Sequence, residues 1–155
     1  RRDTPCDSVA LTNEDHMTKF SLIAGLALAA LAAPAFAGDA AKGESEFKKC
    51  KACHSIIAPD GTAIQKGGKV GPNLYGVIGR QIGTAADFKY GDATIAAGAD
   101  GAVWDEASVV AYLADPNAWL KEKTGDAAAK SKMTFKLAKG GEDVAAYLAS
   151  VKPAQ

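Results

Sequence analysis

Two cysteines and a histidine form the motif that constrains this chain most. Cys50 and Cys53 are separated by two residues, and His54 follows directly. The pattern C-x-x-C-H predicts covalent attachment of a haem, because on one helical turn each cysteine can reach a vinyl group of one porphyrin while the histidine lies beneath the iron. The thioethers would hold the haem permanently, and the imidazole would supply one axial ligand.

Three other interpretations of this motif remain open. A structural disulfide or a thioredoxin-like redox pair would use the cysteines, but neither needs His54, and no alternation of strands and helices surrounds the pair. A zinc site needs about four ligands, so carboxylates would have to complete a set of two cysteines and one histidine. The motif could also occur by chance. Its position in an exported chain favours haem attachment.

The N-terminal part of the chain has the features of a leader that is removed before folding. Met17 is followed by Lys19, by an apolar run over 20–33 and by a small-x-small site that ends at Ala37. This order predicts a signal peptide over 17–37, cleaved after Ala37, and therefore export to the periplasm. A membrane anchor is the alternative, but the run is shorter than the roughly 20 residues that span a bilayer.

Removal of the leader simplifies the search for a second iron ligand. Residues 1–16 lie upstream of Met17 and carry no periodic apolar pattern, so the predicted domain is 38–155. That domain holds one histidine, which excludes bis-histidine ligation by one chain, and one methionine, Met133. Met/His ligation is the common arrangement for electron transfer, and it leaves no open position for a substrate. His54 and Met133 are therefore the predicted metal ligands.

The predicted domain is poor in large apolar side chains. Leu, Ile, Val and Phe make up 21 of the 118 residues of 38–155, a share at which disorder is a possibility. Apolar periodicity and capping residues predict helices over 41–51, over 106–114, from Pro116 onward and over 141–151. The stretch over 55–100 is rich in glycine and shows no strand ladder. The sequence thus predicts a small all-α domain of four to five helices, whose long loops wrap around a cofactor.

Further motifs stand around these residues in a fixed order. They are Gly43 and Phe47 before the cysteines, Gly71-Pro72-Asn73-Leu74 after them, and Tyr147-Leu148 in the last predicted helix. Across 38–152 the sequence resembles the class I c-type cytochromes, and most closely the bacterial cytochromes c2. Its loops over 55–70 and 121–132 are longer than in the short mitochondrial type, which is why the c2 type fits better.

The resemblance implies haem contacts beyond the two ligands. The carbonyl of Pro72 accepts a hydrogen bond from the axial histidine, and Tyr112 bonds towards the methionine sulfur. Ser131 stands where the family often has a threonine, as a hydroxyl near a propionate. The other implied contacts are donors to a buried propionate, Arg80, Tyr90 and Trp104, and the aromatic residue two places beyond the methionine, Phe135.

The function implied by the resemblance is one-electron transport, not enzymatic catalysis. Electrons would pass from a cytochrome bc complex to a photosynthetic reaction centre or a terminal cytochrome oxidase. One alternative is a haem enzyme or gas-binding protein with an open sixth coordination position, and another is a non-haem structural or redox module. The 18 Lys and Arg balance the 18 Asp and Glu, so nucleic acid is not an expected partner. A monomer is expected.

The balanced net charge conceals an uneven distribution. Residues 48–89 hold seven basic and two acidic side chains, 121–139 hold six and two, and 90–120 hold five acidic and no basic ones. The basic segments flank the cysteines and the methionine, so their lysines should surround the haem edge. We expect transient docking to acidic partners that weakens as salt rises, with contributions from Lys132 and Lys136.

Removal of the haem should unfold the chain. Because large aliphatic side chains are few, the haem is expected to complete the hydrophobic core as well as to carry the electron. We expect circular dichroism of the haem-free chain to show little regular secondary structure. A well-folded haem-free protein would contradict this prediction.

Overall fold

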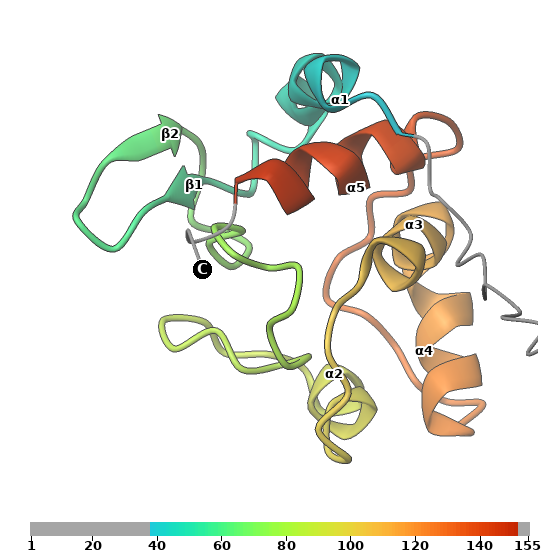
Figure 1. Cartoon of the computed structure of the whole chain (residues 1–155). Coiled ribbons are helices and arrows are strands. Elements are labelled where there is room, and N and C mark those ends of the chain that lie inside the picture. The colour runs from blue at the N-terminus through green and yellow to red at the C-terminus, as the bar shows by residue number, and fades with distance from the viewer. Residues whose placement is uncertain (1–37, 152–155) are drawn as a thin grey trace, which may run out of the picture. The chain divides into compact units, whose positions relative to one another are not determined.

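Five α-helices joined by long irregular segments make up residues 38–151, the part of the chain described by the structure, a computed structural model. The predicted upstream segment and signal peptide lie outside these residues. The elements are α1 (Ala40–Glu46), the 3-10 turn η1 (Phe47–Lys49), β1 (Ile56–Ile57), β2 (Ala63–Gln65), α2 (Asp92–Ala97), α3 (Glu106–Ala114), α4 (Pro116–Thr124) and α5 (Gly141–Ser150). Figure 1 shows α1 beside α5, with α3 and α4 on one side and the small β1–β2 sheet on the other. None of the helices in 38–151 is long and apolar enough to cross a membrane.

The first and last helices pack closely because a glycine lies between them. Gly43 is buried, and a Cβ atom there would collide with the backbone carbonyl of Asp143 on α5. One turn later Phe47 is fully buried, and its ring lies 5.7 Å from that of Tyr147 between centroids. The approach of the last helix at Gly43 agrees with the sequence prediction.

Side-chain caps fix where α3 and α4 begin. Asp105 accepts a hydrogen bond from the Ser108 backbone N–H at 2.7 Å, and Ser108 Oγ accepts one from the Asp105 N–H at 2.9 Å. Asp115 accepts from two backbone N–H groups in the first turn of α4, and Pro116 occupies the first helical position. Both starts were predictable because capping depends on residues only a few positions apart.

The predicted helix over 41–51 is shorter in the structure. The α-helix ends at Glu46, η1 follows, and the Cys50 N–H donates to the Phe47 carbonyl at 2.8 Å. The cysteine motif comes next as one turn, which the His54 N–H closes by donating to the Cys50 carbonyl at 2.9 Å. This turn carries both cysteines and the histidine on a short, hydrogen-bonded segment.

The stretch over 55–100 contains more regular structure than its sequence predicts. β1 and β2 form a two-stranded antiparallel sheet with an irregular register, and α2 lies further along. Strands of two and three residues carry no usable alternation, and a helix of six residues spans less than two turns. The all-α prediction is confirmed for the rest of the described chain, and the helix count lies within the predicted range.

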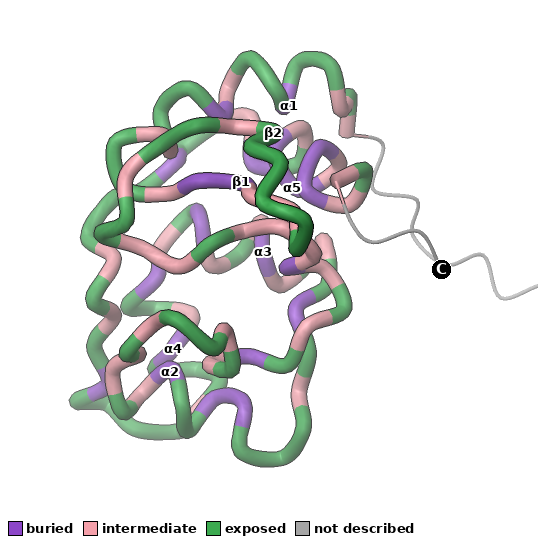
Figure 2. The backbone as a smooth tube through the Cα atoms, turned by 90° about the vertical axis from the view of Figure 1, so that its left-hand side faces the viewer, coloured by how far each residue is buried: buried purple, intermediate pink, exposed green. Residues whose placement is uncertain are grey.

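The buried core gathers side chains from elements far apart in the sequence. Phe47, Ile56, Leu120 and Val144 are fully buried or nearly so. Figure 2 shows the buried stretches of β1 and α5 near each other, while the loops carry mostly intermediate and exposed residues. Irregular segments also contribute buried residues, among them Val77, Ile82 and Leu137, so helices and loops build the core together.

Replacement of Gly43 by valine should destabilise the haem-loaded protein. The added side chain would force α1 away from the Asp143 carbonyl, and such overpacking costs about 1–3 kcal/mol. We expect the free energy of unfolding to fall by about 2 kcal/mol or more in guanidinium titrations. Ala41→Val adds similar bulk at an exposed position of α1 and should cost less than about 0.7 kcal/mol. Equal losses in the two variants would refute the role given to Gly43.

Candidate functional site

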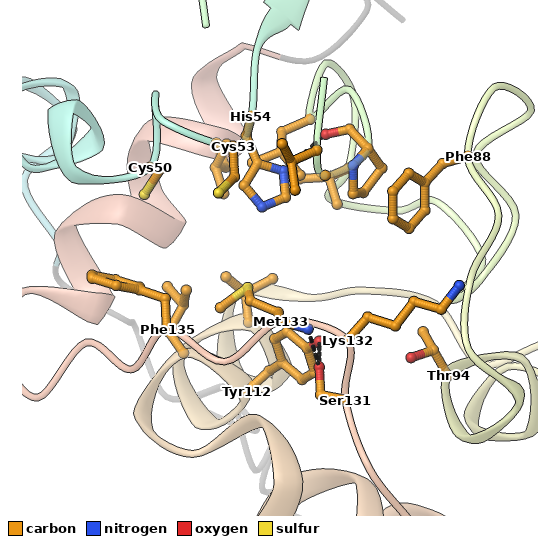
Figure 3. Close-up of a pocket in the computed structure, with 18 of the residues that line it drawn as sticks. Cys50, Cys53, His54, Phe88, Thr94, Tyr112, Ser131, Lys132, Met133 and Phe135 are labelled. Carbon is orange, nitrogen blue, oxygen red and sulfur yellow. Dashed lines mark hydrogen bonds between the residues drawn. The ribbon is translucent and has the colours of Figure 1, made fainter. Parts of the chain in front are cut away.

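One mostly apolar cavity of about 350 Å³ lies between the helices and the loops. Its wall includes every residue that the sequence and the family resemblance assign to the haem: Cys50, Cys53, His54, Pro72, Arg80, Tyr90, Trp104, Tyr112, Ser131, Met133 and Phe135. Figure 3 shows the imidazole of His54 and the thioether of Met133 pointing towards each other from opposite sides of the cavity. An imidazole and a thioether therefore face a common space.

The histidine is oriented by a backbone carbonyl. His54 Nδ1 lies 2.9 Å from the carbonyl oxygen of Pro72, and because a carbonyl can only accept, Nδ1 carries the proton. The other ring nitrogen, Nε2, is then free to bind a metal. Burial lowers the pKa of His54, against the opposing effect of the Pro72 bond, so the neutral form required of a ligand is favoured. Gly71 lies against the ring, where a Cβ atom would collide with it.

The methionine is held by hydrogen bonds to its own segment and to the neighbouring helices. The Met133 N–H donates to Ser131 Oγ at 3.0 Å, and the Ser131 N–H donates to Asn117 Oδ1 on α4 at 2.8 Å. The Tyr112 hydroxyl on α3 lies 2.6 Å from Ser131 Oγ. The resemblance implied a bond from Tyr112 towards the sulfur of Met133, whereas in the structure this hydroxyl contacts Ser131 (Figure 3). Tyr112 is thus linked to the methionine through the serine.

Lys132 joins the methionine segment to the opposite loop. Its Nζ donates to the carbonyl of Lys89 at 2.7 Å, and its aliphatic stem passes over Gly91. Figure 3 shows the side chain extended across one side of the cavity. The bond leaves the positive charge of Lys132 without a carboxylate partner in the described part of the chain.

A half-buried cation lies at the wall of the cavity. The guanidinium of Arg80 donates to the carbonyls of Asn73 at 3.0 Å and Tyr75 at 3.3 Å, and burial lowers the pKa of Arg80. Within 38–151 it forms no ion pair. Burial also raises the pKa of Tyr90, whose hydroxyl therefore remains a donor. A partly desolvated cation with only neutral partners fits an anionic group such as a propionate.

An aromatic cluster supports the wall near Tyr112. The indole of Trp104 is 8% exposed, stacks on Trp119 with centroids 5.0 Å apart, and meets the Tyr112 ring edge-on at 5.1 Å. Trp119 also contacts Tyr112 edge-on at 5.5 Å. The Trp104 ring, which also lines the cavity, is thereby held between two aromatic neighbours.

The two cysteines differ from reactive or zinc-binding cysteines. No disulfide joins them, and burial raises the pKa of the Cys50 thiol to about 11, so an unmodified thiol here is protonated near neutral pH. Reactive redox cysteines instead have lowered pKa values. No group of three histidine, cysteine or carboxylate side chains suited to a metal ion occurs among residues 38–151. These features weaken the redox-pair and zinc interpretations.

The residues around the cavity fit a haem. The space is mostly apolar, the imidazole of His54 and the thioether of Met133 face each other across it, and two cysteines lie at its edge. At its wall lies an arginine that forms no ion pair with any residue of 38–151. Sequence reasoning missed some wall residues, among them Phe88, Thr94 and Val109. Phe88 packs edge-on against Tyr90 at 4.8 Å, but an isolated aromatic residue in a loop gives no signal of that contact.

Comparison with known proteins gives consistent matches over this part of the chain. No protein-family model matches the chain. It is 66% identical over 134 residues to a cytochrome c2 of Rhodobacter capsulatus, covering 86% of this chain and 98% of that protein. It is 58% identical over 139 residues to a cytochrome c-550 of Paracoccus versutus, covering 87% of this chain and 90% of that protein.

Solved structures match in the same way. The X-ray structure of ferric cytochrome c-550 from Paracoccus versutus superposes with a TM-score of 0.73 at 59% identity, covering 75% of this chain and 99% of that one. The structure of cytochrome c2 from Rhodobacter capsulatus gives a TM-score of 0.73 at 67% identity, covering 74% and 98%. The chain therefore shares both its fold and more than half of its aligned residues with these two proteins.

Proposed function

Because the chain belongs to the cytochrome c2 family of class I c-type cytochromes, we propose that it carries single electrons in the periplasm on a haem ligated by His54 and Met133. The cofactor is haem c, one per chain, attached through Cys50 and Cys53. When bound, it supplies an iron that alternates between Fe(III) and Fe(II). The observation that carries the proposal is the facing pair of imidazole and thioether across the apolar cavity.

The two ligand residues have different parts in this proposal. The bond to Pro72 keeps the His54 proton on Nδ1 and raises the electron density at the ligating nitrogen, which favours the ferric state. Thioether ligation by Met133 favours the ferrous state and raises the reduction potential. With both positions filled, no coordination site is open to a substrate. Electron transfer then needs only small movements of the chain.

The propionate side of the site is assigned to Arg80, Tyr90 and Trp104. Each lines the cavity, and Arg80 has no carboxylate partner within 38–151. Their donors would hold a carboxylate that is partly removed from water. Ser131 has its Oγ in contact with Tyr112 and with the Met133 N–H, so its support of the methionine segment is the contribution its contacts favour.

The proposed partners are a cytochrome bc complex as donor and a photosynthetic reaction centre or terminal oxidase as acceptor. Support comes from the family and from the charge distribution, since Lys49 and Lys132 both line the cavity. Lys136, by contrast, forms an ion pair with Asp115 at 2.6 Å and does not line the cavity. Lys132 is therefore the better docking candidate of the two lysines named from the sequence.

Export and removal of 1–37 remain part of the proposal. About three quarters of this chain covers 98–99% of each of two solved relatives, which is the share expected if the rest is a removed leader. Cleavage after Ala37 would leave 38–155 as the mature domain. Sequencing the N-terminus of the periplasmic protein reads this boundary directly.

Replacement of Met133 by alanine should lower the reduction potential and open the sixth position. Loss of thioether ligation removes stabilisation of the ferrous state, so we expect a fall on the order of 0.1 V in a redox titration. Ferric variant protein should also bind added imidazole more tightly than the unaltered protein. Lys130→Ala, in the same segment but outside the cavity wall, should change neither property. Mass spectrometry should find one added haem on the Cys50–Cys53 peptide in every form.

The outcome separates the carrier from the alternative haem enzyme or gas-binding protein. An unaltered protein that already binds imidazole as readily as the Met133→Ala variant, with the same spectrum and potential, has an open sixth position. That result would reject Met133 as a ligand and favour the alternative. A peptide without added haem would reject both haem functions.

Neutralising Lys132 should weaken the salt dependence of electron transfer. Its charge lies beside the cavity and has no carboxylate partner among residues 38–151, so Lys132→Gln should slow reaction with an acidic partner about twofold at low ionic strength. The difference should vanish at high salt. Lys121→Gln changes the same charge on α4, away from the cavity wall, and should have a smaller effect. Stopped-flow rates across a salt series that are flat for the unaltered protein would exclude electrostatic docking.

A further inference from the structure

We propose that Asn73 is a positioning residue for the axial histidine, because its side chain fixes the carbonyl that His54 donates to. The inference deepens the proposed function and rests on His54 being an iron ligand. Asn73 follows Pro72 directly, yet it lies outside the cavity wall. Its effect on the iron would be transmitted through the backbone of Pro72.

The amide of Asn73 pairs with both backbone groups of one residue in β1. The Ile57 N–H donates to Asn73 Oδ1 at 3.0 Å, and Asn73 Nδ2 donates to the Ile57 carbonyl at 2.7 Å. Oδ1 also accepts from the Tyr75 N–H at 3.1 Å. A primary amide carries its acceptor and its donor on separate atoms, so one side chain can accept from the Ile57 N–H and donate to the Ile57 carbonyl at the same time. All three contacts use the polar atoms of a single side chain.

This pairing extends a ladder between two irregular segments. The Gly71 N–H donates to the Cys53 carbonyl at 2.8 Å, and the Leu74 N–H donates to the Ser55 carbonyl at 3.0 Å. The side chain of Asn73 adds the contacts to Ile57, so the segment over 71–75 is held along 53–57. Hydrogen bonds from Gly71 and Leu74 thus hold this segment against the residues on either side of His54.

Pro72 depends on these neighbours for its position. Proline has no N–H, so it cannot add a donor of its own to the ladder. Its carbonyl, however, is the acceptor for His54 Nδ1 at 2.9 Å. The direction of that carbonyl is therefore set by the residues on either side, and Asn73 supplies more of the contacts than Gly71.

Asn73 also contacts the arginine that is assigned to a propionate. The backbone carbonyl of Asn73 accepts from the guanidinium of Arg80 at 3.0 Å. The carbonyl of Pro72 thus holds the axial histidine, and the carbonyl of the next residue, Asn73, holds the arginine that is assigned to a propionate. Movement of Asn73 would disturb both.

A simpler role for Asn73 is that of a turn former. Acceptance from the N–H two residues ahead is the ordinary Asx turn, which aspartate makes as well as asparagine. The donation from Nδ2 to the Ile57 carbonyl distinguishes the two roles, since aspartate cannot make it and would place a carboxylate against that carbonyl. A turn former tolerates Asn73→Asp, whereas a positioning residue does not.

The test compares Asn73→Ala, Asn73→Asp and Asn117→Ala in the haem-loaded protein. Asn117 is the matched control, because its amide supports the methionine segment on the opposite side of the cavity. Hydrogen exchange of the His54 Nδ1 proton in the reduced protein, followed by NMR, reads the bond to Pro72 directly. We expect exchange to accelerate about tenfold in both Asn73 variants, because a net hydrogen bond corresponds to roughly that factor. In Asn117→Ala it should stay within about twofold.

The reduction potential gives an independent test, because the Asn73 and Asn117 variants should shift it in opposite directions. A weaker bond to Pro72 removes electron density from the ligating nitrogen, so Asn73→Ala should raise the potential, while Asn117→Ala should lower it by loosening the methionine. Unaltered His54 exchange in both Asn73 variants would overturn the inference, and Asn73→Asp keeps the test valid if the alanine variant does not fold. Failure of the proposed function would instead show as an unchanged spectrum in Met133→Ala. The two failures can therefore be distinguished.

Discussion

The interior of this domain depends on a space that its own side chains do not fill. The walls come from the cysteine turn, the Gly71–Leu74 segment, α3 and the methionine segment, which are spread between Cys50 and Phe135 in the chain. Few large aliphatic side chains are available to join such distant segments. A flat apolar cofactor that contacts all of them provides the missing buried surface, since burial of apolar area is the main favourable term in folding. The covalent link through Cys50 and Cys53 makes that contribution permanent.

Polar side chains, rather than regular secondary structure, hold the two proposed iron ligands, His54 and Met133, in place. On one side the amide of Asn73 pairs with β1 next to the Pro72 carbonyl, and on the other the amide of Asn117 accepts from Ser131 next to Met133. Loop backbone must satisfy its hydrogen bonds without a helix or sheet ladder, and asparagine side chains can replace the missing partners. No buried side-chain nitrogen or oxygen lacks a partner within 38–151. In both places an asparagine side chain thus joins a loop to a neighbouring strand or helix.

The sequence predicted those parts of the molecule that depend on neighbouring residues or on a compact motif. The starts of α3 and α4 followed from Asp105 and from Asp115-Pro116, and the approach of α5 followed from Gly43. The cysteine motif assigned Cys50, Cys53 and His54, elimination assigned Met133, and the family resemblance assigned the other haem contacts. All of these residues line one cavity. The β1–β2 sheet and α2 were missed because they are too short to carry a period. The contact of Tyr112 with Ser131 was missed because it joins residues 19 positions apart.

The contacts that support His54 and those that support Met133 lie in separate parts of the fold. The histidine side is anchored in β1 and the segment over 71–75, and the methionine side is anchored in α3 and α4. The bond from Lys132 to the Lys89 carbonyl joins the methionine segment to the loop that carries Tyr90, not to the histidine support. Changes to one support can therefore alter one of the proposed ligands while the other keeps its partners. Because thioether and imidazole ligation favour opposite oxidation states, the proposed ligation implies that substitutions outside the cavity wall shift the potential in either direction.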